Sequence, residues 1–198
     1  MADYDYRNFS DGLLQNRFTN FAGADIWRDL VESPNLKSLN ELRSFNSRDW
    51  RRMLKKGLTK PRVFISHRRS DLAPALEVKN AADANGFDYW LDVEDPKLSA
   101  LGYHPDKKAV AVLTAAIIEM ALINCTHVLA VMTPSTAGSL WVPYEYGRIT
   151  EFPTVHGRAA AWLHSNLPQP PEYLLLGVIT NTIDEIENWF RSEATAWH

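Results

Sequence analysis

A stretch of ten residues, SLWVPYEYGR (139–148), is dense in aromatic and charged side chains. Its carboxylate, Glu145, stands three residues before Arg148 and one helical turn after Trp141, so a helix would bring these side chains together. One interpretation is structural: Glu145 forms an ion pair with Arg148, and Trp141 packs in the core. The other is functional: Glu145 is the carboxylate of an active site. The stretch alone does not decide between them, so the elements that position it matter.

Polar side chains also gather at the end of the first predicted strand, RVFIS (62–66). This group comprises Ser66, His67, Arg68 and Arg69. The structural interpretation is a solvated loop in which Arg69 pairs with Asp71 and His67 only fills the loop. The functional interpretation is a ligand site, because a guanidinium matches phosphate oxygens in a bidentate manner.

The second predicted strand, FDYWLD (87–92), carries further candidates. Tyr89 and Trp90 alternate along it, so one is expected in the core while the other lines a pocket or stacks on a base. Asp92 ends the strand, where a carboxylate caps or fixes a loop as readily as it contacts a ligand.

The segment after Pro61 alternates short apolar runs with helix signals. Ser70 and Asp71 can cap the helix after the first strand, and Thr182 opens a capping box for the last helix. The predicted strands are 62–66, 87–92, 127–133, 159–164 and 174–180. This alternation predicts an α/β fold with a flavodoxin-like, doubly wound, five-stranded parallel sheet, in which RVFIS and HVLAVM lie side by side at the centre.

The segment before Pro61 has a different pattern, with short amphipathic stretches joined by polar breaks. It predicts a helical N-terminal extension over residues 1–60, with the α/β domain over 61–198. The extension is rich in large apolar side chains such as Trp27 and Trp50, so it is expected to pack beside the domain.

The predicted sheet favours a site at one edge. In doubly wound sheets, ligands bind outside the carboxyl ends of the strands, near the point where the strand order reverses. The densest polar and aromatic stretches of the chain follow the ends of the first three predicted strands. Glu145 lies in the third of these stretches.

Composition excludes several classes of protein. A net charge of −3 over 198 residues gives no field that would attract nucleic acid or an anionic membrane. The sequence has no glycine-rich phosphate loop, no H-E-x-x-H and no G-x-S-x-G, and its six histidines lack metal-ligand spacing. The single cysteine, Cys125, is expected to be a packed small residue and fits a reducing compartment. A cytoplasmic protein without a bound metal or cofactor is predicted.

Three motifs in order, VFISHRRSD, GFDYWLDVEDP and SLWVPYEYGR, resemble the Toll/interleukin-1 receptor (TIR) domain over about residues 61–195. They are similar to its first strand and loop, its second strand with the BB loop, and its Ser-x-Trp-x-x-x-Glu helix. The size of the chain resembles stand-alone TIR proteins of bacterial anti-phage systems such as Thoeris, which make a cyclic ADP-ribose-type signal from NAD.

The resemblance implies a role for each candidate residue. NAD-cleaving members of the family place a glutamate at the position of Glu145, where a carboxylate can stabilise positive charge on the ribose. NAD would be a substrate rather than a cofactor, and Glu145 the catalytic residue. The resemblance assigns the binding of NAD to Ser66, His67, Arg68, Arg69, Trp90, Asp92 and Trp141. Glu145 is expected to be an exposed carboxylate that contributes little to folding.

The resemblance leaves three functions open. The first is an NAD glycohydrolase or cyclase that releases nicotinamide and makes ADP-ribose or a cyclic ADP-ribose-type signal for a downstream effector. The second is a scaffold that associates with other TIR domains through the BB loop without catalysis. The third is a sensor that binds a nucleotide in the same place without turning it over.

Overall fold

The computed structural model describes residues 60–102, 107–149, 158–164, 167 and 169–197. The predicted N-terminal extension lies outside the described residues, apart from Lys60. The chain divides into two units, one containing Lys60–Leu91 and Cys125–His198, the other including Asp92–Asn124. Each unit is described by itself, and the first, called the sheet unit below, holds all the strands of the described chain.

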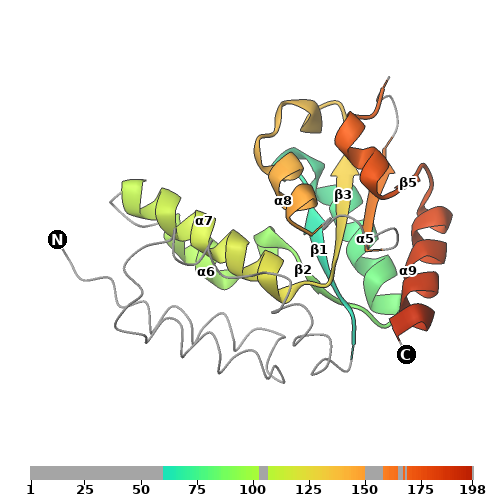
Figure 1. Cartoon of the computed structure of the whole chain (residues 1–198). Helices are drawn as coiled ribbons and strands as arrows, with labels where there is room; N and C mark the ends of the chain where they lie inside the picture. Colours follow the sequence, from blue (N-terminus) through green and yellow to red (C-terminus); the bar gives the residue numbers. More distant parts are fainter. Residues whose placement is uncertain (1–59, 103–106, 150–157, 165–166, 168, 198) are drawn as a thin grey trace. The chain divides into compact units, whose positions relative to one another are not determined.

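The sheet unit is built on five parallel strands in the order β2-β1-β3-β4-β5 (Figure 1). The strands are β1 (Arg62–Ser66), β2 (Asp88–Trp90), β3 (His127–Met132), β4 (Ala159–Leu163) and β5 (Val178–Thr180). Strands β1 and β3 are direct neighbours, with Val63 opposite His127. The predicted sheet, its parallel direction and its central pair are therefore confirmed.

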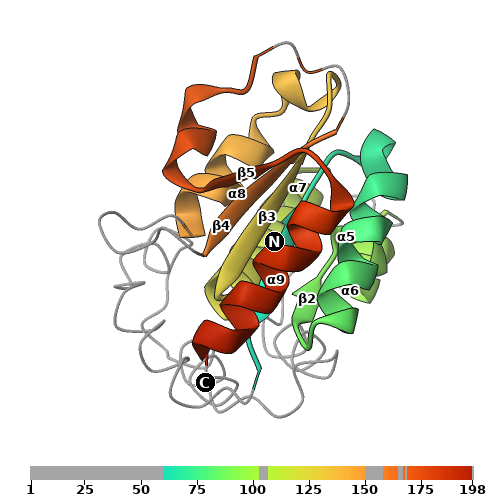
Figure 2. The same cartoon turned by 90° about the vertical axis from the view of Figure 1, so that its right-hand side faces the viewer.

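Three α-helices cover this sheet: α5 (Leu72–Ala84), α8 (Trp141–Ile149) and α9 (Ile183–Trp197). Strand β2 lies on one side of β1, whereas β4 lies on the opposite side of β3. Because such crossovers are right-handed, α5 and α8 lie on opposite faces of the sheet. Helix α9 packs beside α5 (Figure 2). The sheet is thus doubly wound, as predicted.

The two central strands form the middle of the core. Every residue of β1 and β3 is buried, which explains why both read as continuous apolar runs in the sequence. Phe64 stacks on Trp90 of the neighbouring strand with ring centroids 4.6 Å apart. The one guanidinium in β1, Arg62, lies 3.7 Å from Asp88, and burial lowers its pKa.

Local sequence signals set the helix ends. Helix α5 stops at Asn85, whose side chain donates to the Ala81 carbonyl, and Gly86 follows with a positive φ of 78°. Helix α9 begins with the predicted capping box: the Glu185 N–H donates to Thr182 Oγ1 at 3.3 Å, and the Glu185 carboxylate accepts from the Asn181 N–H at 2.6 Å.

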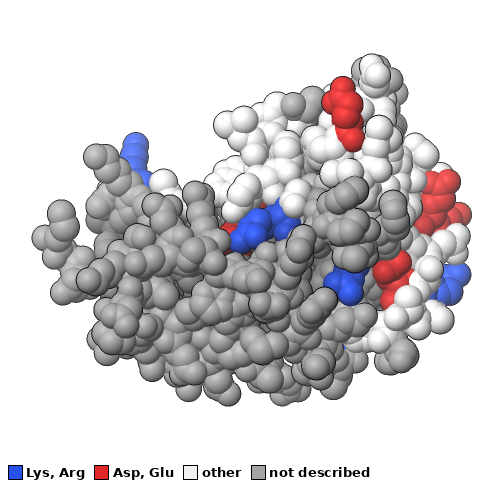
Figure 3. All heavy atoms as spheres, viewed as in Figure 1, with Lys and Arg blue, Asp and Glu red and all other residues white. Residues whose placement is uncertain are grey.

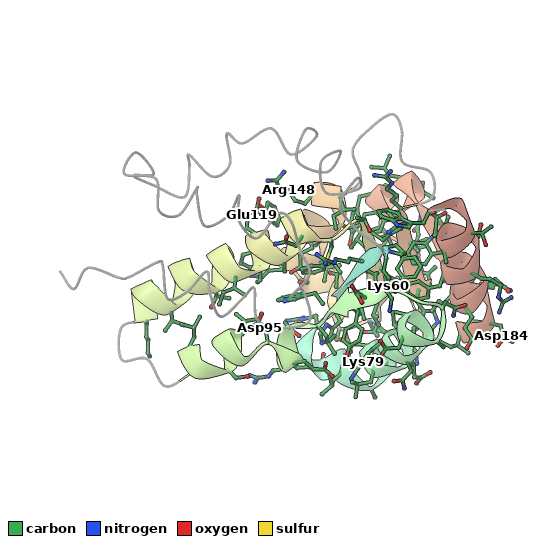
Figure 4. All side chains as sticks on the ribbon, turned by 90° about the horizontal axis from the view of Figure 1, so that it is seen from below. Lys60, Lys79, Asp95, Glu119, Arg148 and Asp184 are labelled. Carbon is green, nitrogen blue, oxygen red and sulfur yellow. The ribbon has the colours of Figure 1, made fainter. Side chains whose placement is uncertain are left out.

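Charged side chains sit at helix surfaces. Asp184 lies in the first turn of α9, where a negative charge favours the helix dipole (Figure 4). Lys79 of α5 lies 5.2 Å from the ring centroid of Tyr89. On the face drawn in Figure 3, the lysines, arginines and acids of the described part form several small groups rather than one continuous charged patch. Among the described helices, none has the length and apolar character needed to cross a membrane.

The two edge strands are shorter than predicted. Strands β2 and β5 span three residues each, because an edge strand has a neighbour on only one side to hold its backbone. The segment predicted to begin β5 instead belongs to a 3-10 helix, η4 (Glu172–Leu176), which follows Pro171 and ends where the Gly177 N–H donates to the Leu174 carbonyl.

The second unit corrects another prediction. The segment after β2, which resembles the BB loop in sequence, is not a loop throughout: it contains η2 (Asp92–Glu94) and α6 (Pro96–Leu101) before α7 (Lys107–Asn124). The signal for α6 is local: the Asp95 carboxylate accepts from the Leu98 N–H at 3.2 Å, and Pro96 occupies the first helical position.

Candidate functional site

The sheet unit has its topological switch point between β1 and β3. The chain leaves β1 toward β2 on one side and leaves β3 toward β4 on the other. The carboxyl ends of these two strands therefore flank the position where ligands bind in doubly wound folds. Ser66 ends β1, and the segment from Thr133 leads from β3 into α8.

A serine and a carboxylate meet at this switch point. The Ser66 hydroxyl donates to Glu145 Oε2 at 2.5 Å, although 79 residues separate them in sequence. Ser66 is 1% exposed and Glu145 is 6% exposed. The expectation of an exposed carboxylate was therefore wrong: Glu145 is held inside the protein by a donor from the central strand. A buried carboxylate with a fixed orientation can stabilise a positive charge on a ligand. It does not fit the interpretation of Glu145 as a charged residue on a solvated helix face.

Trp141 occupies the first position of α8, one turn before Glu145. Its side chain is 43% exposed and meets Tyr144 edge-on, with ring centroids 5.9 Å apart. The structural interpretation that placed Trp141 in the core is therefore wrong. Part of Trp141 is therefore accessible to solvent one turn from Glu145, and an aromatic ring of this kind can stack on a base.

Ser139 gives α8 its start. Its hydroxyl accepts from the backbone N–H groups of Trp141 and Val142, both at 3.3 Å, which satisfies donors that the first turn leaves without helical partners. The serine of the Ser-x-Trp-x-x-x-Glu motif is thus a helix cap, and it sets where α8 begins relative to Glu145.

We expect Ser139→Ala to lower the free energy of unfolding by about 1 kcal/mol, or roughly 2–4 °C in Tm, because two N–H groups lose their acceptor. Thermal unfolding followed by circular dichroism measures the shift. Ser192→Ala is the matched control, since Ser192 is an exposed residue inside α9 and alanine is favoured there. An S139A protein as stable as S192A would contradict the capping role.

The segment after β1 contacts the segment after β3 through Asp71. The Asp71 carboxylate accepts hydrogen bonds from four hydroxyls: Ser135 at 2.8 and 2.7 Å, Thr133 at 2.9 Å, Thr136 at 3.2 Å and Ser70 at 3.3 Å. Burial opposes its negative charge, but these hydroxyls outweigh burial and lower the pKa of Asp71. The group is therefore a carboxylate at neutral pH and acts only as an acceptor.

This arrangement corrects two sequence interpretations of Asp71. Its side chain makes no capping hydrogen bond to α5, although it stands at the N-cap position. Among the described contacts of Asp71, hydrogen bonds from hydroxyls rather than an ion pair with the guanidinium of Arg69 stabilise its negative charge. Sequence reasoning assigned no role to Thr133, Ser135 and Thr136. A signal was present, since three of the four residues that follow the buried strand β3 carry hydroxyls.

The two arginines after β1 are both exposed. Arg68 reaches across to the second loop, where its Nη1 donates to the Ser135 carbonyl at 2.5 Å. A Cβ on Gly138 would lie 3.9 Å from the same nitrogen, an ordinary van der Waals contact, so Gly138 is a neighbour of the guanidinium. Arg69 begins the 3-10 helix η1 (Arg69–Asp71). His67 is half-buried, with Nδ1 3.4 Å from the Ile65 carbonyl.

The three candidates from the second predicted strand lie in different settings. Trp90 is 6% exposed and stacked on Phe64, and Tyr89 is buried as well, so the expectation that only one of them belongs to the core was wrong. Asp92 belongs to η2 in the second unit. The contact of Trp90 and Asp92 with a ligand stays a prediction.

Two other features of the described residues bear on chemistry. No three histidine, cysteine or carboxylate side chains of the described part converge as they would around a metal ion. Cys125 is a buried thiol just before β3, which agrees with its expected role as a packed small residue.

Comparison with known proteins gives one curated relative. Over 86 residues the chain is 28% identical to the probable 3′ cyclic ADP-D-ribose synthase ThsB′ of Bacillus cereus (strain MSX-D12). The match covers 43% of this chain and 41% of that protein, so it spans less than half of the relative. No protein-family model matches the chain.

Among solved structures, a metazoan TIR-STING receptor from C. gigas in complex with 2′,3′-cGAMP aligns with 15% sequence identity and a TM-score of 0.48. The alignment covers 65% of this chain and 39% of that one. The resemblance to the TIR domain rests on the three motifs, the parallel sheet in the order β2-β1-β3-β4-β5 and the curated relative. Together they confirm that the chain resembles the TIR domain of bacterial anti-phage proteins.

Proposed function

We propose that this protein cleaves NAD between nicotinamide and ribose and converts the rest of the molecule into ADP-ribose or a cyclic ADP-ribose-type signal. The observation that carries the proposal is the hydrogen bond between Ser66 and Glu145 at the switch point of the sheet. It holds one oxygen of a buried carboxylate in a fixed direction at the edge where doubly wound sheets bind nucleotides.

The chemistry requires such a group. When the nicotinamide–ribose bond breaks, its electron pair leaves with the nicotinamide nitrogen, which becomes neutral. The ribose C1′ and ring oxygen then carry the positive charge of an oxocarbenium ion. A carboxylate at Glu145 stabilises this charge in the transition state more than it stabilises neutral ribose, which is the condition for lowering the barrier.

Other candidate residues supply binding in this proposal. The exposed guanidinium of Arg68, fixed by the Ser135 carbonyl, and the exposed Arg69 are available to the pyrophosphate. The half-exposed indole of Trp141 offers a stacking surface to a base. These contacts bind substrate and transition state alike, so they act mainly on affinity.

The final step determines the product. Attack of water on C1′, with loss of a proton, gives ADP-ribose; attack by a nucleophile of the same molecule closes a ring and gives a cyclic isomer. The relative named as a cyclic ADP-ribose synthase makes the cyclic product the first one to test. Because the chain resembles stand-alone anti-phage TIR proteins, we extend the proposal to signalling in phage defence.

Incubating the purified full chain with NAD at high protein concentration tests the proposal. We expect nicotinamide release, followed by chromatography, together with a product that mass spectrometry separates from ADP-ribose by the mass of one water. High concentration is used because self-association through TIR surfaces can be needed for activity. Binding of NAD without release would indicate a nucleotide sensor, and neither binding nor release would favour a scaffold; both outcomes reject the enzyme.

A further inference from the structure

The Asp71 carboxylate is the point at which the two loops of the switch point are joined. It lies in η1, after β1, and is 7% exposed. Three of its four hydroxyl donors come from the segment after β3: Thr133, Ser135 and Thr136. A single acceptor thereby ties together two chain segments more than sixty residues apart.

The bonds continue from these hydroxyls into the loop backbone. The Thr136 hydroxyl accepts from the Thr133 N–H at 2.9 Å, and the Thr133 hydroxyl accepts from the Ser135 N–H at 3.1 Å. The Ser139 N–H then donates to the Thr136 carbonyl at 2.9 Å. Ser139 caps α8, which carries Glu145. A continuous series of hydrogen bonds therefore leads from Asp71 to the start of the helix that positions Glu145.

The same loop also fixes an arginine. Ser135 donates its hydroxyl to both oxygens of Asp71, and its carbonyl accepts from Arg68 Nη1. In addition, the Asp71 N–H donates to the Arg68 carbonyl at 2.7 Å. Asp71 thus contacts Arg68 directly through the backbone and indirectly through Ser135. A change of the carboxylate removes the acceptor of the Ser135 hydroxyl and so loosens the attachment through Ser135, whereas the backbone hydrogen bond to Arg68 remains.

We propose that Asp71 is a positioning residue. It sets the placement of Arg68 and Glu145 by accepting hydrogen bonds from hydroxyl groups of the loop after β3. The inference rests on the proposed cleavage of NAD for its catalytic consequence. Asp71 contacts no reacting atom in this scheme. Its effect comes from geometry, and a displacement of about 1 Å at reacting groups can lower a rate by roughly a hundredfold.

Asp71→Asn is the most direct variant, because it preserves shape and removes one acceptor. An asparagine offers one carbonyl oxygen and an NH₂ group that only donates, so it cannot accept the Ser135 hydroxyl on both sides. We expect kcat/KM for nicotinamide release to fall about tenfold to a hundredfold, with changes in both kcat and KM, since Glu145 and Arg68 are both displaced.

A second pair of variants tests the same series of bonds with less risk to folding. Ser135→Ala removes the hydroxyl that bridges the carboxylate, whereas Ser135→Thr retains it. We expect S135A to lower kcat/KM, S135T to restore most of it, and the D71N S135A double variant to lose little more than D71N alone. Additive losses would show that the two residues act independently.

Thr126→Val is the matched control for a variant that loses stability without a displacement of the candidate site. Thr126 is a buried threonine that also joins β1 to β3, but at their amino ends: its hydroxyl donates to the Arg62 carbonyl at 3.0 Å and accepts from the Arg62 N–H at 2.9 Å. We expect T126V to lower Tm and to leave kcat/KM within about twofold, because that edge lies opposite the switch point.

Hydrogen exchange separates this inference from the proposed function. We expect backbone amides of 133–142 to exchange faster in D71N than in wild type or T126V, whether or not the protein cleaves NAD. An inactive wild type with faster exchange in D71N rejects the enzyme and supports loop positioning. An active wild type, with D71N unchanged in kcat/KM and in exchange over 133–142, overturns the positioning role.

Discussion

Glu145→Gln is expected to lower nicotinamide release by roughly a hundredfold or more, in kcat rather than in the affinity for NAD. Glutamine has the shape of glutamate and retains an oxygen that can accept the Ser66 hydroxyl, so the 2.5 Å contact at this position can re-form. The change removes the negative charge that stabilises the oxocarbenium ion, and it replaces the other carboxylate oxygen with an NH₂ group that only donates. Nicotinamide release under saturating NAD measures kcat, and calorimetric titration measures binding.

Ser66→Ala supplies a graded comparison. It leaves the Glu145 carboxylate in place but removes a donor that orients it, so we expect a loss of about tenfold, smaller than that of Glu145→Gln. Far-ultraviolet circular dichroism establishes that each variant is folded. If the Glu145→Gln protein releases nicotinamide at the wild-type rate, Glu145 has no part in the mechanism. The ion pair with Arg148 then becomes the better explanation for a glutamate at this position.

The central strands of the fold were predictable because all of their residues lie in the buried, apolar interior. Strand β1 has the bounds that the run RVFIS gives, and all five of its residues are buried. The edge strand β5 was predicted too long, since Leu174 and its neighbours are as apolar as a strand but follow Pro171 and close into a 3-10 turn. Apolar character identifies buried segments, whereas pairing partners decide where an edge strand ends.

The candidate site was predictable in position and only partly in its contacts. The rule on strand ends and the family resemblance indicated Glu145, Ser66 and Arg68 together. They did not indicate that Ser66 bonds to Glu145, because that contact depends on how α8 packs over a strand 79 residues earlier. Asp71 was predicted to be a helix cap for the same reason. The hydroxyl groups that donate to its carboxylate lie in a loop that is distant in sequence.

Gly177→Ala is expected to lower the free energy of unfolding by about 1–3 kcal/mol, or roughly 2–12 °C in Tm. A Cβ at Gly177 would overlap the Tyr146 hydroxyl and the backbone carbonyl of Ala159. Tyr146 cannot easily leave, since its ring is fully buried and its hydroxyl donates to the Leu174 carbonyl at 3.1 Å. Burial raises the pKa of Tyr146, so this donor stays protonated at any ordinary pH.

The Ala159 carbonyl cannot give way either, because Ala159 is paired with Val128 in the central part of the sheet. Gly147→Ala is the matched control: it makes the same chemical change in the exposed last turn of α8, where an added Cβ meets nothing within 4 Å. Both substitutions restrict the unfolded chain equally, so the difference between them reports the folded state alone. We expect Gly147→Ala to raise stability by about 0.5–1 kcal/mol in urea unfolding, while Gly177→Ala lowers it. Equal stability of the two variants would show that η4 and β4 can separate, and that the close packing of Gly177 does not hold this side of the sheet together.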